Sequence, residues 1–102
     1  MKKTFKLTHS KIKVDRLVEA VRRDVRRYLK RERRRALPEG TDFWDFDCRT
    51  GRNGESAEPV HVSGIIAAID TAARENWEAI YIEILAKPGR RASKPSEADA
   101  DE

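Results

Sequence analysis

One segment near the start of the chain repeats its apolar residues with the period of an α-helix. The apolar positions recur at steps of three and four residues, and they are Val14, Leu17, Val18, Val21, Val25, Tyr28 and Leu29. This spacing places them on one side of an amphipathic helix. Pro38 disfavours helical geometry at the residue before it, so Leu37-Pro38-Glu39-Gly40 is expected to end the helix. A helix of about twenty residues, close to 30 Å long, must therefore pack its apolar side on another element.

Three other segments alternate apolar and polar residues, which is typical of half-buried β-strands. They span residues 3–9, 42–50 and 79–86, and their inward sets are Phe5 and Leu7, then Trp44, Phe46 and Cys48, then Ile80, Ile82 and Ile84. The Asn53-Gly54 dipeptide is a strong hairpin signal and predicts a short return strand within residues 57–62. Pro59 favours an edge position for that strand.

A second, shorter helix is expected after this hairpin. Its apolar stripe consists of Ile65, Ile66, Ile69, Ala72 and Ala73. Ser63 is the predicted N-cap, and Asn76 is the predicted left-handed residue that ends the helix.

The order of these elements predicts an α+β fold, a two-layer α/β sandwich with both helices on one face of the sheet. With the hairpin the pattern is βαββαβ, which is ferredoxin-like; without it the sheet has three strands. A chain of 102 residues fits one domain, expected over residues 1–89. Residues 90–102 form a charged tail without apolar period and are expected to be disordered.

The net charge of +4 conceals a division along the chain. Residues 1–35 hold fifteen Lys and Arg against four acids, whereas residues 36–86 hold three Arg against ten acids. No stretch approaches the roughly 18 apolar residues of a membrane span, and no apolar run follows the basic start as in a secretory signal. The single cysteine, Cys48, fits a reducing cytoplasm.

The first helix carries a row of cations opposite its apolar side. On a helical wheel they fall within about 60° of one another and run about 27 Å along the axis; they are Arg16, Arg23, Arg27, Lys30 and Arg34. Arg22, Arg26 and Arg33 widen the row on one side. This pattern suggests non-enzymatic binding of a polyanion such as a nucleic acid backbone. The alternative is a solvated helix face, or one neutralised by the acidic half or the acidic tail.

A different surface leads to a second hypothesis about function. The open sheet face would display Phe43, Tyr81 and Leu85, which could contact a copy of the chain or an acidic protein. The chain would then be a protein-interaction or homo-oligomerisation module. We expect a monomer or weak homodimer, with a nucleic acid or an acidic protein as partner and no membrane contact.

The remaining reactive residues do not form a catalytic constellation. Asp45 and Asp47 share one strand face, and Glu83 would join them if the strands are neighbours. Three such carboxylates suit Mg²⁺ or Ca²⁺, but they suit pairing with Lys6 equally well. Two distant histidines, His9 and His61, and one thiol lack the clustered spacing of a zinc site. We therefore expect no catalytic residue, no metal and no cofactor, with Cys48 in the core.

Four segments resemble a family of small bacterial proteins that is catalogued only as a domain of unknown function. They are Met1–Lys13, Arg33–Gly40, Asp42–Cys48 and Ile82–Gly89, of which Asp42–Cys48 (DFWDFDC) is the most specific. The likeness covers about residues 1–90 and does not extend to the loop from Arg52 to Pro59 or to the acidic tail. It implies a bacterial, single-domain protein and brings no assigned catalytic residues.

Overall fold

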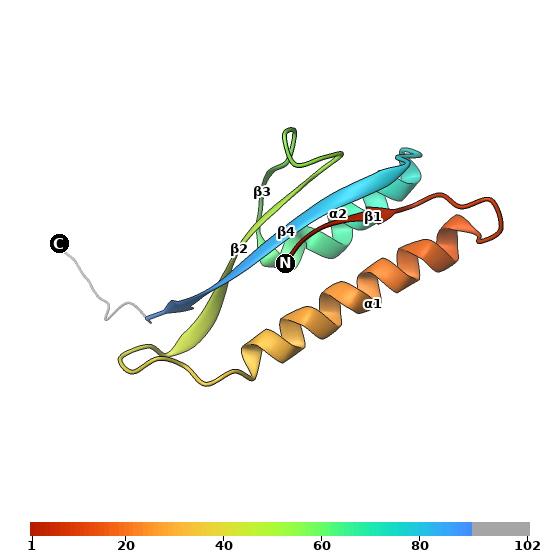
Figure 1. Cartoon of the computed structure of the whole chain (residues 1–102). Coiled ribbons are helices and arrows are strands. Elements are labelled where there is room, and N and C mark those ends of the chain that lie inside the picture. The colour runs from red at the N-terminus through yellow and green to blue at the C-terminus, as the bar shows by residue number, and fades with distance from the viewer. Residues whose placement is uncertain (91–102) are drawn as a thin grey trace.

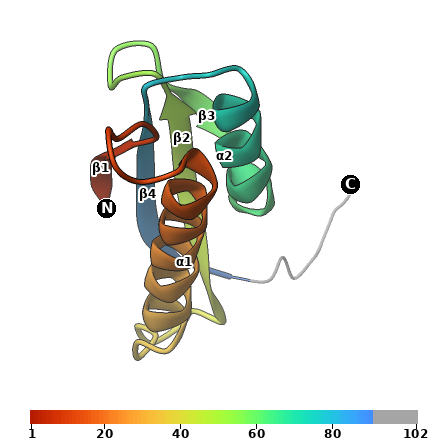
Figure 2. The same cartoon turned by 90° about the vertical axis from the view of Figure 1, so that its right-hand side faces the viewer.

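A computed structural model of the chain describes residues 1–90. It contains a four-stranded antiparallel sheet with two α-helices on one face (Figure 1, Figure 2). In chain order the elements are β1 (Lys2–Lys6), α1 (Val14–Arg33), β2 (Phe43–Gly51), β3 (Glu58–Val60), the 3₁₀ turn η1 (Val62–Gly64), α2 (Ile65–Arg74) and β4 (Ala79–Gly89). The two-layer α+β sandwich is thus confirmed, in its four-stranded form.

The strands lie in the order β1-β4-β2-β3, with every neighbouring pair antiparallel. The βαββαβ order along the chain is as predicted. The centre of the sheet is formed by β4 and β2, which leaves β1 and β3 at the edges. A ferredoxin-like sheet has its first and third strands at the centre, so this sheet keeps the chain order of that fold and has a different strand order.

The core lies between the sheet and the two helices. Helix α1 contributes Val18, Val21, Val25 and Leu29, all buried, and α2 contributes Ile65, Ile69 and Ala72. The sheet contributes Phe5, Phe46, Cys48, Ile80, Ile82 and Ile84. These positions belong to the apolar sets that the helical and strand periods predict. Val14, which the helical period also places on the apolar side, is 41% exposed because it is the first residue of α1. Burial of this apolar area is what fixes α1 along the sheet, with its opposite side outward.

Several boundaries differ from the predicted ones. Strand β1 ends at Lys6 rather than near His9, because the chain then turns toward α1; Leu7 is still fully buried, and its amide donates to the Glu78 carbonyl at 2.8 Å. Strand β4 continues to Gly89 because Phe43 and Trp44 of β2 pair with its last residues.

The predictions for the ends of α2 have opposite outcomes. The Ser63 N-cap prediction is wrong: Ser63 lies inside η1, and Gly64 precedes the helix without a side-chain cap. The Asn76 prediction is confirmed by its φ of 62°. The next amide, of Trp77, donates to the Ala72 carbonyl at 3.0 Å, which closes the helix end.

The C-terminal end of the sheet lies beside the loop that follows α1. Arg90 donates from Nε to the Gly40 carbonyl at 2.7 Å. The remainder of the predicted charged tail, residues 91–102, lies outside the described part of the chain. Over residues 1–90, neither helix combines the length and the apolarity that crossing a membrane requires.

Candidate nucleic-acid interface

Four cationic side chains lie on the side of α1 that faces away from the sheet, and a fifth belongs to Arg34, the C-cap residue that follows the helix. We call them the basic row: Arg16, Arg23, Arg27, Lys30 and Arg34. All five are exposed, whereas the buried residues of α1 lie on the opposite side of the helix. The row is therefore positioned by the same periodicity that builds the core, and the packing of α1 on the sheet keeps it in solvent.

The side chains of the basic row have no ionic partner in the described part of the protein. Between residues 1 and 90, no ion pair, hydrogen bond or ring contact involves any of the five side chains. Two acids of α1 that could have neutralised them are paired with other arginines: Glu19 binds Arg22 at 2.9 Å, and Glu32 binds Arg35 at 2.6 Å. The alternative of neutralisation by the acidic half, residues 36–86, is likewise not seen among the ion pairs of residues 1–90, and the acidic tail lies outside the described residues.

Other arginines of the same helix and its C-terminal end are engaged inside the protein. Arg22 is half-buried and also pairs with Asp70 of α2 at 3.3 Å. The remaining engaged guanidinium groups lie over aromatic rings: Arg31 over Tyr28, Arg33 over Phe46 and Arg35 over Trp44, at 5.0–5.5 Å from the ring centres. Arg22 and Arg33, expected to widen the row, thus make internal contacts.

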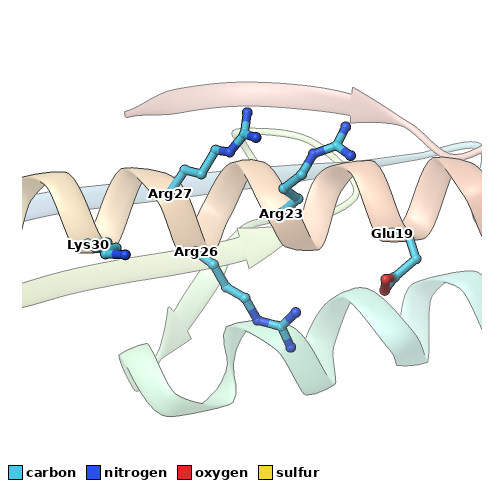
Figure 3. A pocket seen from close by; sticks show the side chains of 5 residues that line it. All are labelled: Glu19, Arg23, Arg26, Arg27 and Lys30. Carbon is cyan, nitrogen blue, oxygen red and sulfur yellow. The ribbon is translucent and has the colours of Figure 1, made fainter.

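A shallow hollow of about 330 Å³ lies on the outer surface of α1. Its lining residues are Glu19, Arg23, Arg26, Arg27 and Lys30 (Figure 3). Arg23 and Arg27 extend together toward the β1 side of the helix, and Arg26 extends toward α2. Since Glu19 is held by Arg22, four cations dominate the hollow. Guanidinium groups one turn apart can bind neighbouring oxygens of phosphate groups through paired N–H donors.

The three carboxylates that were candidates for a metal site are each held by a separate partner. Asp47 pairs with Lys87 at 2.9 Å, and this hydrogen bond raises the pKa of Lys87. Glu83 lies 3.6 Å from Arg49, while Asp45 accepts the amide of Phe46 at 2.8 Å. The pairing of these acids with Lys6 is therefore not observed, and Lys87 and Arg49 take its place.

Glu83 is buried although it lies on the face of the sheet opposite the helices. Tyr81 donates to it at 2.8 Å, and this bond is the main reason that the pKa of Tyr81 is raised. Arg49 faces Glu83 with Nη1, and its Nη2 donates to the Ala57 carbonyl at 2.8 Å. Tyr81, Glu83 and Arg49 therefore form a hydrogen-bonded and ionic cluster across β4 and β2.

The two histidines and the cysteine have local roles. His9 accepts the backbone amide of Lys11 at 2.9 Å, and His61 accepts that of Ser63 at 3.1 Å. Cys48 is buried in the core, and this burial, ahead of the nearby Asp47 and Asp45, raises the pKa of its thiol. Within residues 1–90 no three His, Cys, Asp or Glu side chains are grouped so as to hold a metal ion.

The comparison with protein families identifies the chain at the level of its family. The model of the DUF6172 family, described as a family of unknown function, matches residues 1–95. The chain belongs to this family. No curated protein and no solved structure matches it. The resemblance inferred from DFWDFDC and the other segments is thereby confirmed. Membership in the family assigns no activity.

Two contacts around the interface could not be read from the sequence. Arg22 meets Asp70 across 48 positions, and no spacing rule pairs them. Trp44 donates from Nε1 to the Arg35 carbonyl at 2.9 Å, which ties β2 to the end of α1 across the turn at Pro38. A helical wheel treats all exposed arginines alike, and only the three-dimensional contacts separate the engaged ones from the basic row.

Proposed function

We propose that this protein is a non-enzymatic nucleic-acid-binding module whose basic row contacts the phosphate backbone. The observation that carries the proposal is that the five cations are exposed and have no ionic partner within residues 1–90. The neighbouring arginines Arg22 and Arg35 show that this chain pairs its guanidinium groups with acids where a structural role exists. Within residues 1–90 the row has no such role, and it is open to an external anion.

The geometry of the row is suited to binding a linear polyanion. The row extends about 27 Å from Arg16 to Arg34, along α1 and its C-cap, at 1.5 Å per residue. Four of its five members are arginine, whose planar donors bind phosphate oxygens in pairs. Because the net charge of the chain is only +4, the attraction to nucleic acid would come from this local concentration of charge. Affinity of this kind rises steeply as salt is lowered, since bound phosphates release their counterions.

We propose that this binding takes place in a bacterial cytoplasm. A bacterial cytoplasm contains abundant nucleic acid, and its reducing conditions suit a protein with one free cysteine. Phosphate binding by the row requires neither a cofactor nor a metal ion.

The proposal is tested by fluorescence anisotropy with labelled nucleic acid, starting at about 50 mM salt, where phosphate contacts are strong. We expect the natural chain to bind and a variant with Arg16, Arg23, Arg27 and Arg34 changed to Glu to lose binding. Circular dichroism must show that the variant keeps its helices. Absence of binding by the natural chain, or equal binding by a folded variant, would overturn the proposal.

A second candidate function uses the other face of the sheet. Leu85 is 43% exposed there, and Phe43 and Tyr81 are half-buried, which favours a small interface with a second copy or another protein. The Asp47–Lys87 and Arg49–Glu83 pairs limit its apolar area. Light scattering tests it: a dimer dissociated by Leu85→Lys supports it, and a monomer at all concentrations excludes the homo-oligomer.

A further inference from the structure

The aromatic residues show which kind of nucleic acid the basic row fits. The chain has seven aromatic side chains, and all lie within the described residues. Five of them carry a cation over one ring face: Phe5, Tyr28, Trp44, Phe46 and Trp77. The cations are Lys3, Arg31, Arg35, Arg33 and Arg52, at 4.5–5.5 Å from the ring centres.

The same five rings also pack against the core. Phe5 and Phe46 are buried, and Tyr28, Trp44 and Trp77 are partly buried against the core cluster. A ring with the core on one side and a guanidinium or ammonium group on the other has no free face. An unpaired base could therefore not stack on any of these five rings without displacing a cation.

The other two aromatic residues are far from the row in the fold. Phe43 and Tyr81 alternate with the inward residues of β2 and β4, so they lie on the sheet face opposite the helices. Phe43 packs closely on Gly89, where an added Cβ would lie 2.6 Å from the ring, and Tyr81 is bound to Glu83. Neither can stack a base while α1 binds the backbone of the same nucleotide stretch.

We infer that the ligand of the basic row is a double-stranded nucleic acid, bound through phosphates without base stacking. This inference rests on the proposed function. Proteins that hold single strands gain about 1–3 kcal/mol per stacked base, a contribution that this surface does not offer. A duplex instead presents about one charge per 1.7 Å of axis along a stiff rod.

The size of the row agrees with one side of a duplex. Its length of about 27 Å is somewhat less than one helical turn, which is about 34 Å. Each phosphate contact also releases more counterions from a duplex than from a single strand. The slope of log affinity against log salt is about 0.9 per contact for a duplex and about 0.7 for a single strand. For five contacts at about 50 mM salt, this difference corresponds to at least tenfold tighter binding of the duplex.

The test compares one sequence of about 20 base pairs, roughly two turns, as a duplex and as its separate strands, in DNA and in RNA. Tryptophan fluorescence is recorded with anisotropy, using Trp44→Phe and Trp77→Phe to assign the signal. Bases that stack on a tryptophan quench it. We expect a duplex of at least one of the two nucleic acids to bind about tenfold more tightly than its strands, with neither tryptophan quenched.

The outcomes separate this inference from the proposed function. Single strands that bind as tightly as the duplexes, or that quench Trp44 or Trp77, overturn the duplex inference and leave the row as a phosphate contact. If neither form binds at about 50 mM salt, where such contacts are strong, the proposed function itself is wrong.

Discussion

Arg22 of α1 and Asp70 of α2 form an ion pair, with 3.3 Å between Nη2 and Oδ2. Arg22 also binds Glu19, so its guanidinium is held by acids from both helices. The next residue, Arg23, is exposed and has no such partner within residues 1–90. Two neighbouring arginines thus differ in role: the first fastens the helices together, and the second belongs to the surface proposed to bind phosphate.

The different roles of Arg22 and Arg23 predict different effects on stability. Arg22→Gln breaks both ion pairs and leaves Asp70 without this partner, so we expect a cost of about 0.5–1 kcal/mol, or a melting temperature about 2–6 °C lower. Arg23→Gln should change stability by less than about 0.5 kcal/mol. Thermal unfolding followed by circular dichroism compares them, and equal melting temperatures would contradict the assignment.

The two tryptophans form a similar matched pair. Trp44 donates its indole N–H to the Arg35 carbonyl, whereas the buried indole N–H of Trp77 has no partner within residues 1–90. Both rings lie under an arginine, so replacement by Phe removes similar packing from each. We expect Trp44→Phe to lower the free energy of unfolding by about 1 kcal/mol more than Trp77→Phe, because it alone breaks a hydrogen bond. Urea unfolding measures this, and the reverse order would refute it.

The bond between Tyr81 and Glu83 predicts a dependence on pH. It raises the pKa of Tyr81 above its usual value of about 10, so the folded chain holds the phenolic proton more tightly than the unfolded chain. The stabilisation is complete below pH 10 and is lost as the pH rises through the raised pKa. We expect Glu83→Gln to move the pKa back toward about 10.

Ultraviolet absorbance of the phenolate measures this titration. Both tyrosines absorb, and burial also raises the pKa of Tyr28. The comparison is therefore made with Tyr28→Phe present in both proteins, so that Tyr81 alone is followed. A titration curve that does not shift on Glu83→Gln would show that this carboxylate does not control the phenol.

The hairpin between β2 and β3 depends on a close backbone contact at Gly51. An added Cβ at this position would lie 2.7 Å from the Ala57 Cα, so Gly51→Ala must push the strands apart. We expect a loss of about 1–3 kcal/mol, as for other overpacked sites. Gly54→Ala, whose Cβ would meet only Tyr81 at 3.8 Å, is the control. Equal unfolding free energies would contradict the contact.

Periodicity accounts for what the sequence could predict. The spacing of Val18, Val21, Val25 and Leu29 defines both the buried side of α1 and, on the opposite side, the basic row. Alternation likewise assigns Ile80, Ile82 and Ile84 to the core. A period says which side of an element is inward and says nothing about which strand lies next to which. The central position of β4 and the edge position of β1 therefore had to come from the structure.

The same limit applies to the partners of charged residues. Glu83 has the sequence position of an outward residue, yet Tyr81 and Arg49 cover it. Arg22 lies on the flank of the basic row, yet its guanidinium group forms an ion pair with Asp70 of α2. Such contacts join residues with no fixed sequence spacing, because tertiary packing rather than helix or strand period brings them together.

Phosphate binding by the basic row predicts how the salt dependence of duplex binding differs between two charge-matched variants. Arg23→Gln with Arg27→Gln removes two cations from the row, and Lys2→Gln with Lys6→Gln removes two exposed cations from edge strand β1. We expect the first pair of changes to reduce the slope of log affinity against log salt by about 1.8, at about 0.9 per phosphate, and the second pair to leave it unchanged. Equal slopes for the two variants would contradict phosphate binding by the row.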